Sequence, residues 1–316
     1  MFGDEAWNAL GLVVDVVAEC ADVSRLLEHP RAAQIEVLLT SWGSPRLDAE
    51  VLHRLPALRL VAHVAGSVRR VVTDAVWERG ITVLSAADAN NEPVAEYVCA
   101  QTVLALKDVH RRTRRITAER TVPGITGIPG IGGGAVGLVS FGSIARKVAR
   151  RLRRLGVEVL AWDPYQPAET FAADGAVQVA GLPELVSRSR VLSIHTPLIA
   201  GRTDGLLGGD LLRLLPPGAT VLNTARGAVV DEAGLIDVLR ERPDVFAVLD
   251  VTTEEPPLPD SPLYTLPNCQ LTGHVAGAVG AEQLALGRLV VDDLRRYAAG
   301  RAPEHAVSRQ DAPLRA

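Results

Sequence analysis

The sequence lacks a regular cysteine pattern, long apolar runs and a strong excess of charge. Its three cysteines, Cys20, Cys99 and Cys269, have no metal-ligand spacing, so we expect reduced, buried thiols rather than disulfides or a metal site. No apolar run approaches the roughly 18–20 residues of a membrane span, and residues 1–5 lack the basic start of a secretory signal. With a net charge of −4, the protein has no overall electrostatic attraction to nucleic acid or anionic lipid. These absences predict a cytoplasmic protein with neither nucleic-acid nor membrane partners.

Lysine is almost absent as well, because Lys107 and Lys147 are the only two among 33 basic residues. The arginines are concentrated in two stretches, residues 110–115 and 146–154. Apolar residues at helical spacing interrupt both stretches, so solvated helix faces are favoured over a nucleic-acid patch.

Short apolar runs alternate with helical stretches along most of the chain. Bounded by turn residues, such runs are typical of parallel strands that are buried on both faces. The alternation predicts a doubly wound α/β architecture. The runs exceed what one compact sheet holds, so we expect two Rossmann-like domains with parallel sheets. The runs cover residues 12–17, 36–39, 60–64, 81–84, 135–139, 158–161, 191–194, 220–222, 245–249 and 269–271.

Two longer helical stretches are candidates for the crossings between these domains. The first is expected from about Pro93, since proline suits the first turn of a helix, to Arg115. The second is expected from about Ala281 to Ala299, and Gly300 is placed to end it.

A literal G-x-G-x-x-G match spans residues 132–137 but lies in the wrong context. A dinucleotide-binding loop follows a strand and opens a helix, so that the helix N-terminus faces the pyrophosphate. This match precedes its strand and belongs to a glycine-rich connector over residues 124–134, which we expect to be a loop. We therefore reject it.

The required context follows directly after the run at 135–139. There the segment Ser140-Phe141-Gly142-Ser143-Ile144-Ala145 leads into a helical stretch from Arg146 to Leu155. In this degenerate S-x-G-x-x-A, Gly142 permits close approach of the backbone to phosphate, and Ala145 is tolerated where helix and strand meet. Ser140 replaces the first glycine of the tight turn, where serine has less backbone freedom.

An acidic residue supports this interpretation. Asp163 follows the next strand, about 20 residues beyond the loop, where a carboxylate binds the ribose hydroxyls of NAD and repels the 2′-phosphate of NADP. The alternative is a turn or capping aspartate before Pro164.

Three further residues follow three later strands, at the edge of an open α/β sheet where ligands bind. Arg226 can bind a carboxylate with two parallel hydrogen bonds. Glu255 stands before Pro256, with Glu254 as its competitor, and His274 can exchange a proton near neutral pH. Two of the three have a structural alternative, which is a surface ion pair for Arg226 and a structural histidine for His274.

The segment from Asn223 to Glu232, followed by Glu255 and His274, resembles the active-site motif of the D-isomer-specific 2-hydroxyacid dehydrogenase family. The resemblance implies an NAD-dependent oxidoreductase that interconverts a 2-oxo acid and a (D)-2-hydroxy acid. In such an enzyme Arg226, Glu255 and His274 are catalytic, and Glu255 favours the charged form of His274. The implied cofactor-binding residues are Phe141, Gly142, Ser143, Ile144, Asp163, Pro164, His195, Thr196, Pro197, Thr224, Ala225, Asp250, His274 and Gly277.

The resemblance also implies a domain division and a homodimer joined through the cofactor domains. The substrate domain is expected over residues 1–93 and 282–316, with the NAD-binding domain, 94–281, inserted between them. The family opens with a strand, whereas this chain opens with a helical stretch near residues 5–10. Either that strand is absent, or the natural start lies upstream.

The substrate domain matches the family less well. A turn at Ala65, Gly66 and Ser67 offers backbone N–H groups for the carboxylate of a substrate, as Arg226 does with its side chain. Arg69 and Arg70 then stand where the family has acidic and amide residues. They favour an anionic substrate or pair with surface carboxylates. Trp42 and His63 are further candidates for the pocket.

Two other functions compete with the dehydrogenase. A non-catalytic NAD(H)-sensing scaffold, similar to the corepressors among the relatives, would keep the fold without turnover. A dehydrogenase of formate or phosphite would use another reduced donor. The family's formate dehydrogenases, by resemblance, have a glutamine at the position of Glu255, which speaks against formate. The arginine-rich turn does not resemble the active site of a phosphite dehydrogenase.

Overall fold

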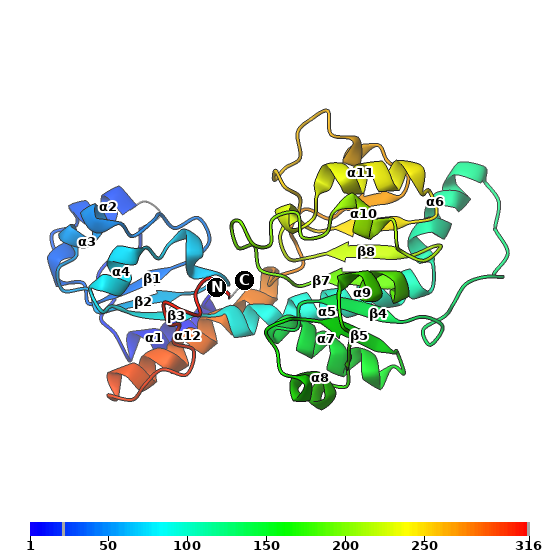
Figure 1. Cartoon of the computed structure of the whole chain (residues 1–316). Coiled ribbons are helices and arrows are strands. Elements are labelled where there is room, and N and C mark those ends of the chain that lie inside the picture. The colour runs from blue at the N-terminus through cyan, green and yellow to red at the C-terminus, as the bar shows by residue number, and fades with distance from the viewer. Residues whose placement is uncertain (21–22, 315–316) are drawn as a thin grey trace. The chain divides into compact units, whose positions relative to one another are not determined.

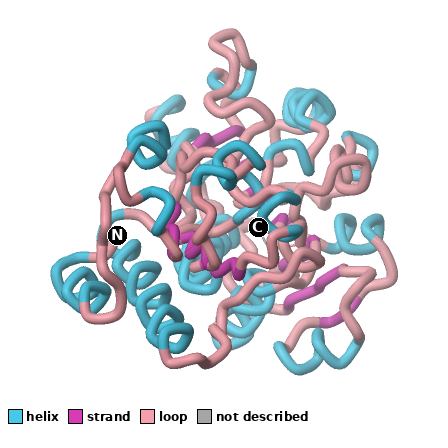
Figure 2. Tube along the Cα trace, turned by 90° about the vertical axis from the view of Figure 1, so that its left-hand side faces the viewer, coloured by secondary structure: helices cyan, strands magenta, loops and turns pink. Residues whose placement is uncertain are grey.

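The computed structural model describes residues 1–20 and 23–314, and the chain forms two compact units. One unit comprises residues 1–91 and 278–316, and the other, residues 92–277, is inserted into it. These limits lie a few residues from those expected from the sequence. The strands have four residues or fewer, and loops make up much of the chain between them (Figure 2).

The discontinuous unit contains a three-stranded parallel sheet in the order β1-β2-β3. Because successive strand residues point to opposite faces, Val61 packs with α3 and α4, whereas Leu60 and Ala62 pack with α1 and α12. Helices therefore cover both faces of this sheet (Figure 1). The elements are α1 (Gly3–Gly11), α2 (Val23–Glu28), β1 (Val37–Thr40), α3 (Ala49–Arg54), β2 (Leu60–His63), α4 (Asp74–Glu78), β3 (Thr82–Ser85) and α12 (Gln283–Ala298).

Residues 12–17 do not form the strand that their apolar sequence predicted. The N–H groups of Val13 and Val14 instead donate to the carbonyl of Leu10 and close the end of α1. Residues 13–20 and β1 both line a cavity of about 890 Å³, and residues 12–17 are not part of the β1-β2-β3 sheet. The prediction was wrong because apolar composition does not by itself provide a strand with a hydrogen-bonding partner.

The inserted unit contains a seven-stranded sheet in the order β10-β9-β8-β7-β4-β5-β6, with all neighbours parallel. One apolar cluster joins a face of the sheet to α9, α10 and α11, and a second joins the other face to α5, α7 and α8 (Figure 1). The predicted doubly wound α/β fold is thus confirmed. The elements are α5 (Ala87–Leu106), α6 (Val109–Glu119), β4 (Val136–Val139), α7 (Ser143–Arg154), β5 (Val159–Trp162), α8 (Ala168–Asp174), β6 (Val177–Gln178), α9 (Leu182–Arg188), β7 (Val191–Ile194), α10 (Gly209–Leu212), β8 (Thr220–Asn223), α11 (Glu232–Glu241), β9 (Phe246–Leu249) and β10 (Cys269–Leu271).

The helix expected over residues 93–115 is two helices with different limits. α5 begins at Ala87, and Pro93 lies inside it rather than in its first turn. Asp108 has a left-handed backbone with φ of 59° and separates α5 from α6. An α-helix cannot continue through that conformation, so the break falls within the predicted span. The C-terminal helix is closer to expectation, since α12 ends at Ala298 and Gly300 is left-handed.

The cysteine prediction holds for two of the three residues. Cys99 and Cys269 are buried free thiols, and burial raises the pKa of the first to about 11 and of the second to about 12. Cys20 is exposed, so the expectation of a buried thiol was wrong there. No helix in the described ranges is both long and apolar enough to cross a membrane.

His63 makes the stability of the discontinuous unit depend on pH. Its Nδ1 lies 3.0 Å from the Thr40 hydroxyl, and burial lowers its pKa to about 4. In the unfolded chain the imidazole titrates near its ordinary pKa of 6.5. Between these pKa values only the unfolded state binds the proton, so the folded state loses stability as the pH falls.

We therefore expect the His63→Asn variant to lose less stability than the wild type between pH 7 and pH 5. The expected difference is about 1–2 kcal/mol in the free energy of unfolding, measured by denaturant titration at both pH values. His53→Asn, which alters an exposed histidine of the same unit, should leave the dependence unchanged. Equal losses in wild type and His63→Asn would contradict the assignment.

Candidate active site

The candidate cofactor loop follows β4, where the strand order of the inserted unit reverses. β4 is paired with β5 on one side and β7 on the other, so the chain leaves β4 toward one edge and later returns to its other flank. In doubly wound sheets this switch point is where ligands bind. α7 begins at Ser143 directly after the loop, with Gly142 as its N-cap.

Ser140 adopts the backbone conformation that a first glycine would have. Its φ is 70°, in the left-handed region that costs a non-glycine residue about 1–2 kcal/mol. Its N–H donates to the carbonyl of Trp162, and its hydroxyl lies 2.9 Å from that of Thr196, at the end of β7. These two bonds fix the serine in a turn that its side chain does not favour.

Asp163 accepts hydrogen bonds both from this loop and from the turn that follows β5. One of its carboxylate oxygens accepts from the N–H of Phe141 at 2.8 Å, and the other accepts from the N–H of Tyr165 at 2.9 Å. A carboxylate offers about four acceptor positions, so Asp163 can accept further hydrogen bonds from a ligand. The structure thus joins two of the predicted cofactor-binding residues across β4 and β5.

The loop and its neighbours fit a dinucleotide. A Cβ placed on Gly142 would meet no atom within 4 Å, so the backbone there is open to a ligand. Among the described residues, His195 Nδ1 and Thr224 Oγ1 are buried polar atoms that have no hydrogen-bond partner. Burial lowers the pKa of His195 to about 3, so the imidazole is neutral. Buried polar groups are normally paired, and a bound dinucleotide could supply the partner.

The rejected glycine match has a different role. Gly137 lies within β4, and a Cβ there would lie 1.9 Å from the hydroxyl oxygen of Ser189. That glycine lets the segment after α9 approach the sheet and is not part of a loop. Gly137 is therefore a packing glycine within the sheet.

Arg226 lies on the loop after β8, next to the strand that precedes Glu255. A buried amide, Asn223, holds this loop by accepting from the N–H of Ala225 and donating to the carbonyl of Arg226, each at 3.0 Å. A Cβ on Gly227 would fall 1.9 Å from the carbonyl carbon of Thr252, so the two loops are in direct backbone contact. Arg226 as a whole residue is partly buried.

Glu255 and His274 are brought together by the loops after β9 and β10. Glu255 Oε2 lies 2.8 Å from His274 Nδ1, and both side chains remain about half exposed. Since an ionised carboxylate only accepts hydrogen bonds, the proton of this contact lies on Nδ1. The other ring nitrogen, Nε2, is then the one that can exchange a proton with a ligand.

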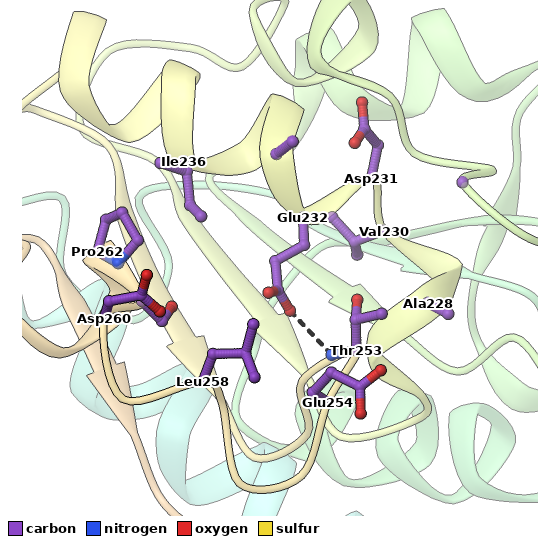
Figure 3. Close-up of a pocket in the computed structure, with 13 residues that line it drawn as sticks. Ala228, Val230, Asp231, Glu232, Ile236, Thr253, Glu254, Leu258, Asp260 and Pro262 are labelled. Carbon is purple, nitrogen blue, oxygen red and sulfur yellow. Dashed lines mark hydrogen bonds between the residues drawn. The ribbon is translucent and has the colours of Figure 1, made fainter.

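Glu254, the competing carboxylate, lines a separate cavity of about 650 Å³ with Asp231, Glu232 and Asp260 (Figure 3). Glu232 accepts a hydrogen bond from the N–H of Thr253 at 2.8 Å and so fixes the loop just before the two glutamates. The geometry therefore distinguishes the neighbours, because it is Glu255 that contacts the histidine.

Several of these supporting residues were not expected from the sequence. Asn223, Glu232 and Thr272 hold loops through side-chain hydrogen bonds to residues 2 to 22 positions away. Asn223 and Glu232 lie in the segment 223–232 that contains Arg226, and this was the one sequence signal that could have identified them. Thr272 beside His274 carried no pattern of its own.

The predicted substrate turn lies in the other unit. The Ser85 hydroxyl donates to the carbonyl of Gly66 at 2.6 Å, and the backbone of Ser67 bonds to His63. Arg69 and Arg70 are exposed on the short helix that follows, Val68–Arg70. Trp42, the other candidate, is also exposed.

Comparison with known proteins assigns a family to this architecture. The model of the D-isomer-specific 2-hydroxyacid dehydrogenase NAD-binding domain matches residues 99–276. An (S)-sulfolactate dehydrogenase of Chromohalobacter salexigens is 35% identical over 311 residues, which are 95% of this chain and 97% of the relative. A D-3-phosphoglycerate dehydrogenase of Archaeoglobus fulgidus is 29% identical over 94% of this chain, which spans only 55% of that relative's length. The D-mandelate dehydrogenase of Rhodotorula graminis has the same fold, with a TM-score of 0.82, 23% identity and coverage of 97% of this chain and 94% of the other.

Proposed function

The chain belongs to the D-isomer-specific 2-hydroxyacid dehydrogenase family, and on this premise we propose that it interconverts a 2-oxo acid and a (D)-2-hydroxy acid with NAD. The observation that carries the proposal is the 2.8 Å contact between Glu255 and His274 beside an NAD-binding fold. A scaffold that only senses NAD(H) would not need a histidine with one nitrogen held by a carboxylate and the other available to a ligand.

The proposed roles follow from the chemistry of each side chain. Arg226 binds the carboxylate of the substrate and stabilises charge that grows on the carbonyl oxygen. His274 donates a proton to that oxygen during reduction and removes it during oxidation. Glu255 orients the imidazole and stabilises its positive charge. When bound, the nicotinamide supplies or accepts the hydride.

We also propose further contacts with substrate and cofactor. Backbone N–H groups of Ala65, Gly66 and Ser67 assist in binding the substrate. The NAD contacts are assigned to the residues around the switch point and the later strand ends, which are Phe141, Gly142, Ser143, Ile144, Asp163, Pro164, His195, Thr196, Pro197, Thr224, Ala225, Asp250, His274 and Gly277. We also propose a homodimer.

We further propose that the substrate carries a second anionic group. Arg69 and Arg70 follow the substrate turn and are both exposed. Sulfolactate and 3-phosphoglycerate, which name the two relatives described above, each have a sulfonate or a phosphate besides the carboxylate. Guanidinium groups are well suited to such oxyanions, and this favours the anionic substrate of the two alternatives for these arginines.

The proposal is tested by following NADH oxidation with two groups of 2-oxo acids. One group has a second anion, as in 3-sulfopyruvate and 3-phosphohydroxypyruvate, and the other lacks it, as in glyoxylate, pyruvate and phenylpyruvate. The paired substitution Arg69→Gln and Arg70→Gln should lower kcat/KM about tenfold or more for the first group only, since each charge-assisted hydrogen bond contributes roughly 1.5–3 kcal/mol.

Arg295→Gln, which alters a surface arginine of the same unit paired with Asp292, is the control. Equal activity with both groups in the wild type would exclude the second anion. Absence of turnover with tight NADH binding would instead favour the sensing scaffold.

Asp163→Ala should change the choice of cofactor. Loss of the carboxylate removes hydrogen bonds to the ribose and repulsion of a 2′-phosphate. We expect the KM for NADH to rise about tenfold, while the KM for NADPH falls or stays the same. Initial rates with both cofactors measure this, and an unchanged NADH/NADPH ratio would count against the ribose assignment.

A further inference from the structure

The backbone of His274 is held in a left-handed conformation that is unfavourable for a residue other than glycine. Gly273 and His274 are consecutive left-handed residues, with φ of 73° and 62°. Glycine adopts this conformation freely, but histidine does so only where its surroundings hold it. The imidazole itself contacts Glu255 through Nδ1 and is about half exposed. The constraint on the backbone must therefore come from other groups.

Asp250 supplies that constraint. It is buried after β9, and its backbone carbonyl accepts from the N–H of His274 at 2.7 Å. Its carboxylate accepts from the N–H of Val275 at 2.9 Å, from the N–H of Ala276 at 3.0 Å and from the hydroxyl of Thr272 at 2.6 Å. One aspartate thus holds the chain on both sides of the left-handed pair.

The hydroxyl of Thr272 receives a hydrogen bond in turn from α5. The Tyr97 hydroxyl lies 3.0 Å from Thr272 Oγ1. Since Thr272 has one hydroxyl proton and the carboxylate can only accept, Thr272 donates to Asp250 and accepts from Tyr97. Burial raises the pKa of Tyr97, with a smaller contribution from the charge of Asp250, so its phenol keeps the proton that it donates. The direction of every bond in this chain is therefore determined.

We propose that Tyr97 and Thr272 are positioning residues for His274, which act by fixing the orientation of Asp250 and, through it, the left-handed loop. This rests on the proposed function of His274 as the proton donor. Neither side chain needs to touch substrate or cofactor. Their effect is on the direction in which the imidazole points, because the Asp250 carboxylate sets the backbone of residues 272–276.

The test compares Thr272→Val, Thr272→Ser and Tyr97→Phe. Thr272→Val removes the hydroxyl at similar volume, and we expect kcat to fall about 10- to 100-fold, which is the scale of a misplaced catalytic group. Thr272→Ser, which keeps the hydroxyl, should restore most of the rate. Tyr97→Phe should have the same effect to a smaller degree. Thr73→Val is the control, because its hydroxyl donates to a backbone carbonyl, that of Leu47, in the other unit.

A second readout does not depend on turnover. Hydrogen exchange of the Val275 and Ala276 amides, resolved by NMR, should accelerate at least about tenfold in Thr272→Val and Tyr97→Phe, because the carboxylate that accepts from both amides loses its orientation. The exchange of these two amides should stay at the wild-type rate in the control, Thr73→Val.

The result that overturns the proposal is wild-type kcat and wild-type exchange in both variants. If the wild type itself reduces no 2-oxo acid, the proposed function fails, and the exchange rates still decide whether Tyr97 and Thr272 hold the loop. If Thr272→Val does not fold, Tyr97→Phe provides both readouts.

Discussion

Replacement of His274 by asparagine is expected to lower kcat for reduction of a 2-oxo acid by about 10²- to 10⁴-fold, the usual contribution of a positioned general acid. Asparagine keeps a hydrogen-bonding group near Glu255 but cannot donate a proton to the substrate oxygen. NADH affinity should stay within a few-fold of the wild type, because His274 is only one of the proposed NAD contacts and the loop after β4 is unchanged. Steady-state rates and NADH fluorescence titration measure the two quantities separately.

His29→Asn is the matched control, since His29 is a partly exposed histidine of the other unit and has no role in the proposed chemistry. It should leave kcat unchanged. A His274→Asn variant that keeps more than about a tenth of the wild-type rate would show that another group supplies the proton.

Arg226→Lys is expected to lower kcat/KM by about 10- to 100-fold although the positive charge is retained. Lysine cannot form the two parallel hydrogen bonds of a guanidinium with a carboxylate, and each charge-assisted bond contributes roughly 1.5–3 kcal/mol. Since Arg226 is also assigned to charge on the carbonyl oxygen, kcat should fall as well as KM rise.

The control for this substitution is Arg240→Lys, which alters a surface arginine on α11 of the same unit. It should have no effect on either constant. If Arg226→Lys raised KM alone, with kcat unchanged, Arg226 would bind the substrate without stabilising the transition state, and the second half of its role would be wrong.

Most strands could be predicted from their continuous apolar sequence. Three features of the fold could not, and each has a physical reason. Two-residue β6 is too short to produce a pattern and is exposed at the edge of its sheet. Residues 12–17 have the composition of a strand but no strand partner among the described residues. The break at Asp108 depends on one left-handed residue that composition does not indicate.

The candidate residues that directly follow strands could be predicted from the sequence. Residues that contact them from distant parts of the sequence could not. Order along the chain placed Arg226, Glu255 and His274 at the ends of β8, β9 and β10, which are neighbours in the sheet. The preference for Glu255 over Glu254 came from its position before Pro256, and their different surroundings support it.

Contacts between distant segments could not be inferred in the same way. Tyr97 reaches Thr272 across 175 positions of sequence, and a single sequence gives no sign of such a pair. The tolerance of Ser140 for a left-handed turn also depends on its partner Thr196, which lies 56 positions away. Motif order therefore identifies the candidate reacting groups, whereas the residues proposed to position them become visible only in the fold.

The proposed reaction can be measured by incubating the wild type and His274→Asn with NADH and 3-sulfopyruvate or 3-phosphohydroxypyruvate, and following both the loss of NADH and the formation of the 2-hydroxy acid. We expect equal amounts of the two in the wild type and a rate lower by about two or more orders of magnitude in the variant. NADH loss without the hydroxy acid, or equal rates in the two proteins, would contradict it.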